Sequence, residues 1–480
     1  MSKHWALDAA LNGRRPSWRE LLPLTEATGA DLHALCATAD ALRAQQAGDA
    51  VTYVLNRNIN FTNVCVKKCG FCAFSRTGRS EEGYFLDTEE IVRRVVEARA
   101  LGATEVCIQA GLAPGLDGMF YVELTRAVKR AVPEIHLHAF SPEEVKYGAH
   151  RARLPVREYL AALREAGLGT LPGTSAEILD DTVRDKLAPG RITSAEWLDV
   201  VRTAHELGLR TTATMMYGHL ESPADRLRHM ETIRDLQRET GGFTEFVPLS
   251  FVHDEAPLFA AQPGVRPGPG GLDVVRTHAL ARVVLGADLP NLQVSWVKEG
   301  MRVAEHLLAC GVNDLGGTLM NESISTSAGA RHGQFATPAE LRRVAHNAGR
   351  VAVERTTLYR IIDAAAAGSR DREVDALDGI GDAASTFGTY AALTRDERFR
   401  FRRRRGGEQL VEVGGRVEIE GEAVGPYHGD AQAGSGGADQ VTREAVAVAE
   451  ASGQRGGQAQ REGVGAELIA IRRKHQVRAV

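Results

Sequence analysis

The chain has 480 residues, of which 43% are hydrophobic and 25% charged, values that exclude a wholly disordered or fibrous protein. Its 58 lysine and arginine residues nearly balance 62 acidic ones, and the formal net charge of −4 gives no general reason to expect a nucleic-acid or membrane partner. The length allows two or three domains, or one large α/β barrel with extensions.

Residues 1–50 are predicted to form an N-terminal helical segment. From about residue 15, leucine and alanine recur at helical spacing, and Gly48 is suited to end the helix. The first residues lack the apolar stretch and cleavage site of a signal peptide, and no apolar run approaches the ~18–20 residues that span a bilayer. We therefore expect a cytoplasmic protein without a membrane segment.

Residues 51–330 alternate short apolar runs with longer amphipathic stretches. Helices are predicted after capping residues, at 87–101, 193–207 and 222–240. Repeated strand–helix units are typical of a parallel α/β fold, and the length favours a TIM-like (β/α) barrel over an open doubly wound sheet, although periodicity alone does not separate the two. The predicted strands are residues 52–63, 104–110, 135–140, 168–172, 211–217, 244–251, 292–297 and 313–319.

The remaining chain is predicted to hold one more helix and a tail. A capping threonine and Pro338 suit the start of a helix over 338–364, so residues 331–365 form a C-terminal helical segment. Residues 366–480 contain 19 of the 50 glycines and only five aromatic residues, too little bulk for a good core. We predict a Gly-rich, mostly disordered tail with a weak hairpin pattern over 409–424.

Three cysteines, Cys65, Cys69 and Cys72, stand close together in a loop after the first predicted strand. Thiolates are soft ligands that favour iron–sulfur clusters, zinc or copper(I). A structural zinc site normally needs four protein ligands, and no second pair of cysteines is present. Three ligands in one loop suit a four-iron cluster with one iron left open, while zinc, a disulfide or chance remain the alternatives. The other cysteines are scattered and resemble small core residues: Cys36, Cys107 and Cys310.

The CxxxCxxC spacing, with an aromatic residue before the last cysteine, resembles the signature of the radical S-adenosylmethionine (SAM) enzymes. The resemblance implies a [4Fe-4S] cluster on Cys65, Cys69 and Cys72, with SAM bound to the open iron through its amino and carboxylate groups. An electron from the cluster would break the C5′–S bond and give methionine and a 5′-deoxyadenosyl radical. Phe71 would lie against the adenine.

Two further segments match the SAM site of these enzymes. Gln109 and Gly111 follow the second predicted strand, where small residues let the backbone approach a ligand, and the resemblance implies that they bind the SAM amino group. Related sequences usually read Gln-Gly-Gly here, so Ala110 is a mild departure, and a plain strand-to-loop turn is the alternative. Glu177 follows the fourth predicted strand and could accept the ribose hydroxyls, although a charge at a helix N-terminus would also explain it.

Other motifs narrow the resemblance, which runs from about residue 20 to residue 365. Together they resemble the group that holds the futalosine-pathway enzymes of menaquinone synthesis and the deazaflavin FO-synthase components. The run over 244–253 is most similar to the FO-synthase subunit 2 family, the tyrosine-using 4-hydroxyphenyl transferases. Only one cysteine triplet is present, so the chain resembles a stand-alone subunit rather than a fused synthase. The motifs lie at 56–63, 216–219, 239–253, 295–298 and 313–320.

Membership of this family would imply the following reaction. The 5′-deoxyadenosyl radical takes a hydrogen from L-tyrosine, the Cα–Cβ bond breaks to give 2-iminoacetate, and the 4-hydroxybenzyl radical adds to C5 of 5-amino-6-(D-ribitylamino)uracil. An external reductant would supply the electron. A functional partner, FO-synthase subunit 1, would then close the ring of FO, the precursor of coenzyme F420. No nucleic-acid or membrane partner is expected.

Polar side chains at the carboxyl ends of strands usually carry the chemistry of barrels. We expect Tyr217, His219, Glu245 and His253 to act on the substrates, because histidine can hold a substrate or move a proton near neutral pH. Each histidine could instead be a packing residue. Hydrogen bonds to the uracil and ribityl groups could come from Asn60, Asn63, Glu245 and Ser250, and His138 could also face the lumen.

Two competing functions remain. A dehypoxanthine futalosine cyclase would share the cluster and the SAM site, but the sixth predicted strand favours the deazaflavin enzyme. A non-catalytic metal-binding or interaction protein would work through the tail, with the four arginines over 402–405 as its contact site. The wider basic run over 399–405 could touch RNA or an acidic partner. The intact cysteine triplet argues against the second function, and a solvated charge run explains the arginines more simply.

Overall fold

The computed structural model describes residues 3–362 and 375–402 of the chain. Six strands pair in one parallel sheet, in the order β2-β3-β4-β5-β6-β7. These are β2 (Asn56–Ile59), β3 (Glu105–Ile108), β4 (His136–Ala139), β5 (Thr170–Leu171), β6 (Arg210–Tyr217) and β7 (Phe243–Ser250). A second parallel sheet, in the order β8-β1-β9, consists of β1 (Ala50–Val54), β8 (Asp314–Gly317) and β9 (Val351–Glu354).

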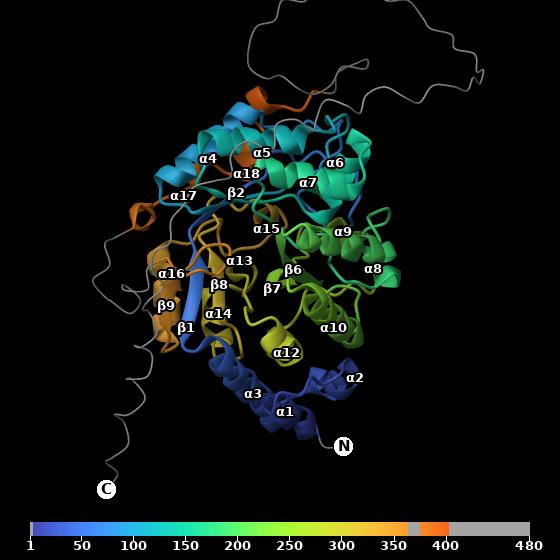
Figure 1. The fold of residues 1–480 in the computed structure, drawn as a ribbon, viewed down its shortest axis with the longest axis vertical. Helices are drawn as coiled ribbons and strands as arrows, with labels where there is room; N and C mark the ends of the chain where they lie inside the picture. Colours follow the sequence, from blue (N-terminus) through green and yellow to red (C-terminus); the bar gives the residue numbers. More distant parts are fainter. Residues whose placement is uncertain (1–2, 363–374, 403–480) are drawn as a thin grey trace, which may run out of the picture. The chain divides into compact units, whose positions relative to one another are not determined.

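The two sheets close into a barrel. Only Leu55 separates β1 from β2, and β1 pairs with β8. Two isolated parallel bridges, Phe246 with Leu292 and Gln293 with Asp314, connect β7 to β8. Strand pairing therefore runs from β2 through β7 to β8, and β8 pairs with β1, which continues into β2. The predicted TIM-like (β/α) barrel is confirmed (Figure 1).

The seventh predicted strand, residues 292–297, is wrong as a regular strand. The segment makes only the two bridges and then turns into helix α13 (Trp296–Glu299). Leu292, Val294 and Trp296 alternate like a strand, and all three are buried. Ser295 and Val297 are buried as well, so the apolar pattern reflects burial of an irregular segment rather than a ladder of hydrogen bonds.

Helices cover the outside of the barrel (Figure 1). Asp87, Thr193 and Ser222 each accept a backbone N–H from the first turn of the helix that follows, so three predicted helices begin where their caps indicated. No helix in the described part of the chain is long and apolar enough to cross a membrane. The helices that follow the strands are α4 (Thr88–Ala100), α5 (Phe120–Ala131), α6 (Pro142–Ala152), α7 (Val156–Ala166), α8 (Asp181–Leu187), α9 (Ser194–Glu206), α10 (Pro223–Thr240), α11 (Pro257–Ala261), α12 (Gly271–Leu285), the 3₁₀ turn η2 (Gly286–Asp288), α14 (Met301–Leu307) and α15 (Ile324–Ser327).

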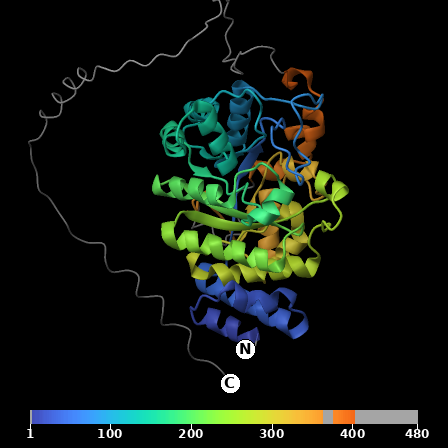
Figure 2. The same cartoon turned by 90° about the vertical axis from the view of Figure 1, so that its right-hand side faces the viewer.

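The N-terminal helices pack at one end of the barrel, beside α12 (Figure 2). The predicted helical segment is interrupted, because Pro23 stands at the start of a 3₁₀ turn and a new helix begins after Thr28. Leu35, Ala39 and Leu42 are the buried face of that helix. The elements are α1 (Lys3–Leu11), α2 (Trp18–Leu21), η1 (Leu22–Glu26) and α3 (Gly29–Ala47).

The predicted helix over 338–364 is wrong beyond Asn347. Helix α16 (Pro338–Asn347) ends before Gly349, whose φ of 70° suits glycine. The β-branched run that follows pairs with β1 as strand β9. The helical interpretation failed because sequence spacing does not reveal the open edge of β1, which favours a strand here.

The predicted disorder from residue 366 onward is wrong for residues 375–402. This stretch contains η3 (Ala376–Gly379), α17 (Ala383–Phe387), α18 (Tyr390–Leu393) and η4 (Glu397–Phe399). Residues 383–401, here called the C-terminal strap, bond to the barrel: Asn321 donates to the Phe387 carbonyl at 2.6 Å and Phe85 N–H to the Phe399 carbonyl at 2.7 Å. The rest of the predicted tail, including the possible hairpin over 409–424 and residues 403–405 of the basic run, lies outside the described residues.

Candidate active site

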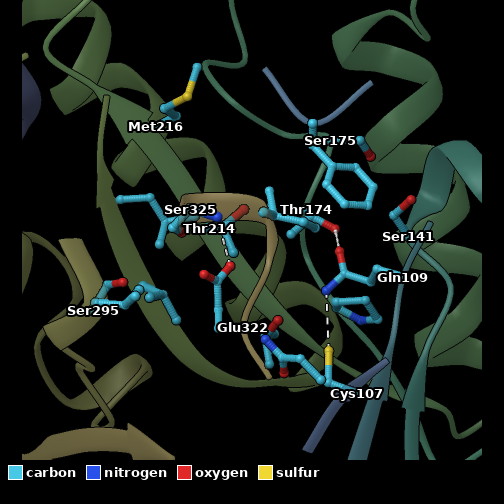
Figure 3. Close-up of a pocket in the computed structure, with 18 of the residues that line it drawn as sticks. Cys107, Gln109, Ser141, Thr174, Ser175, Thr214, Met216, Ser295, Glu322 and Ser325 are labelled. Atoms are coloured by element: carbon cyan, nitrogen blue, oxygen red, sulfur yellow. Dashed lines mark hydrogen bonds between the residues drawn. The ribbon is translucent and has the colours of Figure 1, made fainter. Parts of the chain in front are cut away.

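A cavity of about 390 Å³ occupies the lumen of the barrel toward the carboxyl ends of the strands (Figure 3). Side chains of β6 and β7 line its interior, and the loops after β2, β3, β4 and β5 line its mouth. This is where enzymes with parallel barrels carry their reactive groups. The arrangement makes the cavity the candidate site.

The loop that carries the three cysteines forms one wall of this cavity, and Cys65, Cys69 and Cys72 all line it with free thiols. The loop is fixed by backbone bonds to other loops. Val66 N–H donates to the Leu112 carbonyl and Gly70 N–H to the Leu187 carbonyl, each at 2.9 Å. The thiols are therefore presented by a supported loop.

Burial raises the pKa of the Cys69 thiol to about 12 and also raises the pKa of Cys65. The charge of Arg191 opposes this shift at both thiols. A bound metal ion favours the thiolate form of its ligands, so thiols in this setting lose their protons when positive charge arrives with the metal.

The donor set fits a cluster better than a single ion. Within residues 3–362 and 375–402, no group of three His, Cys, Asp or Glu side chains converges closely enough to hold one metal ion. In a four-iron cluster each cysteine binds a different iron, so the ligands surround the cluster instead of meeting at one point. Three thiols along one cavity wall fit a [4Fe-4S] cluster with one iron open to another ligand.

The turn after β3 lies against the start of the cysteine loop. Gly111 N–H donates to the Thr62 carbonyl at 2.9 Å. The Gln109 side chain accepts from the Thr174 hydroxyl at 2.6 Å and lies 3.2 Å from the Cys107 sulfur, as Figure 3 shows. Both predicted SAM-binding residues thus line the same cavity as the cysteines, and Cys107 faces the cavity rather than the core.

Glu177 lies beside the cysteine loop in a strained turn, with φ of 45°. Its Oε1 pairs with Arg191 at 2.8 Å, and Arg191 also pairs with Glu143 at 3.2 Å. The Arg191 guanidinium lies 5.8 Å from the centre of the Phe71 ring. Glu177 stands before α8 rather than in its first turn, so the alternative of a helix N-terminal charge does not describe it.

Glu245 is the one predicted catalytic residue that lines the cavity. Its Oε2 accepts from Arg355 at 3.2 Å and from the Tyr359 hydroxyl. Burial raises the pKa of Glu245 to about 7, while the charge of Arg355 lowers it. Arg355 is held in turn by Asp314, at 2.5 and 3.1 Å.

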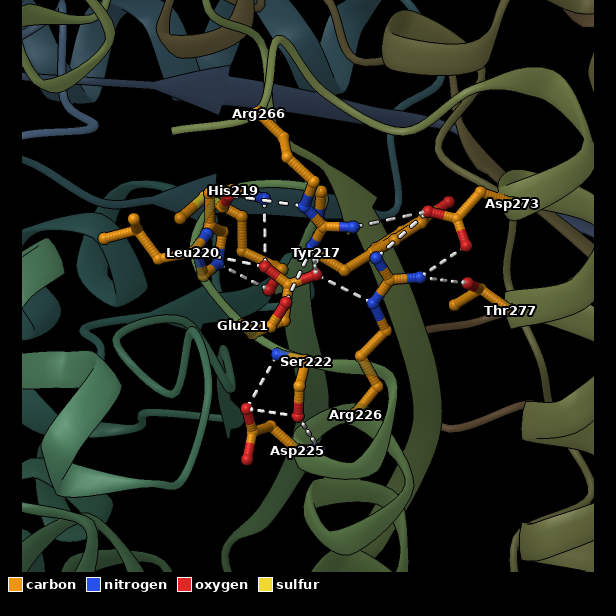
Figure 4. A network of polar contacts seen from close by, with 12 residues as sticks. Tyr217, His219, Leu220, Glu221, Ser222, Asp225, Arg226, Arg266, Asp273 and Thr277 are labelled. Atoms are coloured by element: carbon orange, nitrogen blue, oxygen red, sulfur yellow. Dashed lines mark hydrogen bonds and ion pairs between the residues drawn. The ribbon is translucent and has the colours of Figure 1, made fainter. Parts of the chain in front are cut away.

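Tyr217, His219 and His253 lie outside the cavity lining. Side chains alternate along β6, and Met216 faces the cavity, so Tyr217 faces the helix layer, where Arg226 stacks on its ring (Figure 4). His219 is fully buried and its Nε2 lies 3.0 Å from the Met216 carbonyl. The first two side chains are thus held by contacts with the protein's own residues, outside the cavity lining.

Of the remaining polar candidates, one lines the cavity and the others lie outside its lining. His253 packs its ring on Phe259, at 4.6 Å between centroids. His138 lines the cavity, and its Nδ1 lies 2.7 Å from the Thr170 hydroxyl. Outside the lining are Asn60, Asn63 and Ser250.

Sequence reasoning did not find Arg191 or Arg355. Arg191 follows Gly190 in the turn between α8 and α9 and carries no spacing signal. Arg355 falls in the stretch that the sequence assigned to a helix, so its place at the end of β9 was hidden.

Comparison with known proteins gives two family matches and close relatives. The model of the radical SAM superfamily matches residues 59–233, and that of the CofH/MqnC C-terminal region matches residues 240–367. The chain is 49% identical over 344 residues to the 5-amino-6-(D-ribitylamino)uracil–L-tyrosine 4-hydroxyphenyl transferase of Methanothermobacter thermautotrophicus, covering 72% of this chain and 94% of that protein. It is 50% identical over 345 residues to the FO synthase of Mycobacterium tuberculosis, covering 72% of this chain but 40% of that protein.

Solved structures share the fold at low sequence identity. Methylornithine synthase (PylB) matches with a TM-score of 0.58 and 18% identity, over 72% of this chain and 96% of that one. The hydrogenase maturase HydG of Carboxydothermus hydrogenoformans matches with a TM-score of 0.57 and 17% identity, over 75% of this chain and 80% of that one. The resemblances inferred from the cysteine spacing and from the run over 244–253 are confirmed: the chain belongs to the radical SAM superfamily and, within it, to the family of the 5-amino-6-(D-ribitylamino)uracil–L-tyrosine 4-hydroxyphenyl transferases.

Proposed function

We propose that the protein transfers the 4-hydroxybenzyl group of L-tyrosine to C5 of 5-amino-6-(D-ribitylamino)uracil in the synthesis of FO, the precursor of coenzyme F420. The carrying observation is the 49% identity along 94% of the archaeal transferase. The futalosine cyclase is not favoured, because these relatives are named as the transferase and as FO synthase.

Members of this family use a [4Fe-4S] cluster and SAM. When bound, these groups supply the electron and the 5′-deoxyadenosyl fragment that takes a hydrogen atom from tyrosine. Cys65, Cys69 and Cys72 would hold three of the irons. Their common cavity wall and free thiols support this assignment.

The neighbouring residues suit the parts of SAM. Phe71 would lie against the adenine, and the turn that contains Gln109 and Gly111 would receive the amino group. Glu177 would accept the ribose hydroxyls. Arg191 engages its Oε1, whereas its Oε2 makes no hydrogen bond within the described part of the chain. Arg191 thus orients the carboxylate and leaves an oxygen for a hydroxyl.

Chemical requirements of the reaction and of the cysteines support the functional partner and the cellular location that we propose. Ring closure of FO needs a second activity, which we assign to FO-synthase subunit 1, and the electron needs an external reductant. The chain spans only 40% of the FO synthases, whose remaining length could hold that second activity. A cytoplasmic location is supported by the cysteines, all six of which are free in this structure, as a reducing compartment would keep them.

The test is anaerobic reconstitution with iron and sulfide, followed by reduction and addition of SAM, L-tyrosine and the aminouracil. Mass spectrometry should find 5′-deoxyadenosine and the hydroxybenzyl–uracil adduct. Cys69→Ala should abolish both products, while the matched control Cys310→Ala, which changes a buried cysteine outside the cavity, should keep them.

Other outcomes would change the proposal. Deoxyadenosine without the adduct would retain SAM cleavage and redirect the search to futalosine-type substrates. Neither product, from protein with a full complement of iron and sulfide, would contradict the enzymatic function.

A further inference from the structure

Four cationic side chains line the cavity, and three of them are already paired. The fourth is Lys298. Its ammonium group makes no hydrogen bond or ion pair with any residue in 3–362 or 375–402. The paired cations are Lys67 with Glu143 at 3.1 Å, Arg191 with Glu143 and Glu177, and Arg355 with Asp314 and Glu245.

The backbone that carries Lys298 is firmly held. Lys298 belongs to α13, whose first residue, Trp296, is 1% exposed and donates its indole N–H to the Gly317 carbonyl at 2.9 Å. Gly300 N–H closes the turn by donating to the Trp296 carbonyl at 2.7 Å. The short helix therefore presents the amine from a fixed position in the wall.

Burial lowers the pKa of Lys298, and the nearby carboxylates Glu322, Glu299 and Glu177 raise it. Lys298 is half-buried, and an ammonium group that loses part of its hydration is costly unless an anion lies against it. The three carboxylates are close enough to influence Lys298, yet none of them forms an ion pair with it, and Ser250 and Arg191 hold Glu299 and Glu177. An anionic ligand would complete the environment of this amine.

Glu322 lines the same cavity and is 5% exposed. It accepts backbone N–H groups from Ser325 at 2.8 Å and Thr326 at 3.3 Å, and Figure 3 shows the first of these bonds. Burial raises its pKa, so this carboxyl would gain from a cationic neighbour. Lys298 and Glu322 line the same cavity and interact electrostatically without forming an ion pair, so both face a ligand that carries the opposite charges.

We propose that Lys298 and Glu322 form the subsite for the α-amino acid end of the substrate L-tyrosine. The Lys298 ammonium binds the carboxylate of tyrosine, and the Glu322 carboxylate accepts a hydrogen bond from the amino group. The inference rests on the proposed function, because that function supplies an α-amino acid as substrate.

The other ligands of the cavity fit Lys298 less well. In this family the amino and carboxylate groups of SAM are taken up by the open iron, and the aminouracil carries no carboxylate. The three remaining cations of the cavity already bind the protein's own carboxylates. Tyrosine is therefore the ligand whose anionic group lacks another partner.

Equilibrium binding of labelled L-tyrosine to the oxidised holoenzyme with SAM, without reductant, tests the subsite in the absence of turnover. Lys298→Gln should weaken tyrosine binding about 10–100-fold, as expected for loss of a charge-assisted hydrogen bond, and Lys298→Arg should recover part of it. Tyramine, which lacks the carboxylate, should bind the wild type weakly and Lys298→Gln equally weakly. The corresponding probe for Glu322 is 3-(4-hydroxyphenyl)propanoate, which lacks the amino group. It should bind the wild type weakly and Glu322→Gln equally weakly.

Lys186→Gln, at an exposed lysine of α8, is the matched control and should bind tyrosine as the wild type does. Unchanged tyrosine binding by Lys298→Gln would overturn the subsite, as would a defect confined to SAM binding. If Lys298→Gln fails to hold its cluster, the test uses the wild-type protein alone. Equal affinities of the wild type for tyrosine and tyramine would then overturn the proposed subsite. Adduct formation by the wild type is measured on the same preparation; its absence would count against the proposed function instead.

Discussion

At Gly111 the turn after β3 lies directly against the backbone before the cysteine loop. A Cβ atom there would lie 2.4 Å from the Val64 carbonyl oxygen and 2.8 Å from its carbon. Both are backbone atoms directly before Cys65, so neither can rotate away as a side chain could. The geometry of the cysteine loop thus depends on a glycine in the neighbouring strand end.

Gly111→Ala should displace the cysteine loop and reduce the iron bound per chain after reconstitution. Overpacking of this kind costs about 1–3 kcal/mol, so the free energy of unfolding should fall by that amount in denaturant titrations. Gly270→Ala is the control, because a Cβ at that position meets nothing within 4 Å. Wild-type iron content in Gly111→Ala would contradict this view of the turn.

Glu144 links the same turn to α6, since its carboxylate accepts from Ala110 N–H at 3.0 Å and from Ser141 N–H at 2.7 Å. Burial raises the pKa of Glu144 to about 7, above the value of about 4.3 for an exposed glutamate. The native state therefore holds this proton more tightly than the unfolded state. The resulting stabilisation is complete below about pH 4.3 and is lost as the pH rises through 7.

Glu144→Gln should accordingly flatten the pH dependence of the free energy of unfolding between pH 4.5 and pH 7.5. The shift corresponds to roughly 3 kcal/mol across this window. Urea titrations of the metal-free protein at several pH values measure it, with Glu134→Gln, an exposed position, as control. Parallel pH profiles for the wild type and Glu144→Gln would show that Glu144 does not titrate in this way.

At the scale of elements, the cysteine loop depends on the C-terminal strap, which lies more than 300 residues further along the chain. The Tyr390 hydroxyl donates to the Phe74 carbonyl at 3.0 Å and accepts from Asn63 at 3.1 Å. Its ring lies 5.2 Å from that of Phe74, which lines the cavity. The strap thus supports the loop from behind.

Tyr390→Phe keeps the ring and removes both hydrogen bonds. We expect a loss of about 1–2 kcal/mol in the free energy of unfolding and faster bleaching of the cluster absorbance in air, because the loop opens more often. Tyr159→Phe is the control, because it removes a single hydrogen bond, from a tyrosine of α7 to the Gly118 carbonyl. Equal bleaching rates for the two variants would contradict a supporting role for the strap.

The elements that the sequence revealed are those with local signals. Cysteine spacing and helix caps act within a few residues, so the cysteine loop and three helix starts were predicted. The direction of Tyr217 was not, because β6 is buried at seven of its eight positions and its apolar pattern does not tell the inner from the outer face. The order of the strap was not predicted, because the composition of residues 366–480 was judged as a whole. Its Gly-rich character concealed the four aromatic residues of the strap, Phe387, Tyr390, Phe399 and Phe401.

On the scale of the whole molecule, the described chain has three parts: the barrel, the N-terminal helices at one end, and the strap against the cysteine loop. The matched family region ends at residue 367, before the strap begins. Phe387 and Phe401 are 5% and 8% exposed, so the strap contributes buried apolar surface to the same fold.

A chain that ends at residue 402 should therefore be more stable and bind more iron than one that ends at residue 374. Burial of two phenylalanines contributes about 3–6 kcal/mol. Thermal unfolding and iron analysis compare the two chains directly. Equal stability of both would show that the strap is dispensable.

The pairing of Phe85 with Phe399, and of Gly83 with Phe401, also sets an order of events during synthesis. At about 5–20 residues per second, the ribosome needs roughly 15–60 s to travel from the cysteine loop to the strap. For most of that interval the cysteine loop exists without the strap that packs against it. The finished loop, and with it the site for the cluster, is thus complete only after the strap has been synthesised, and the thiols depend on the reductants around them until then.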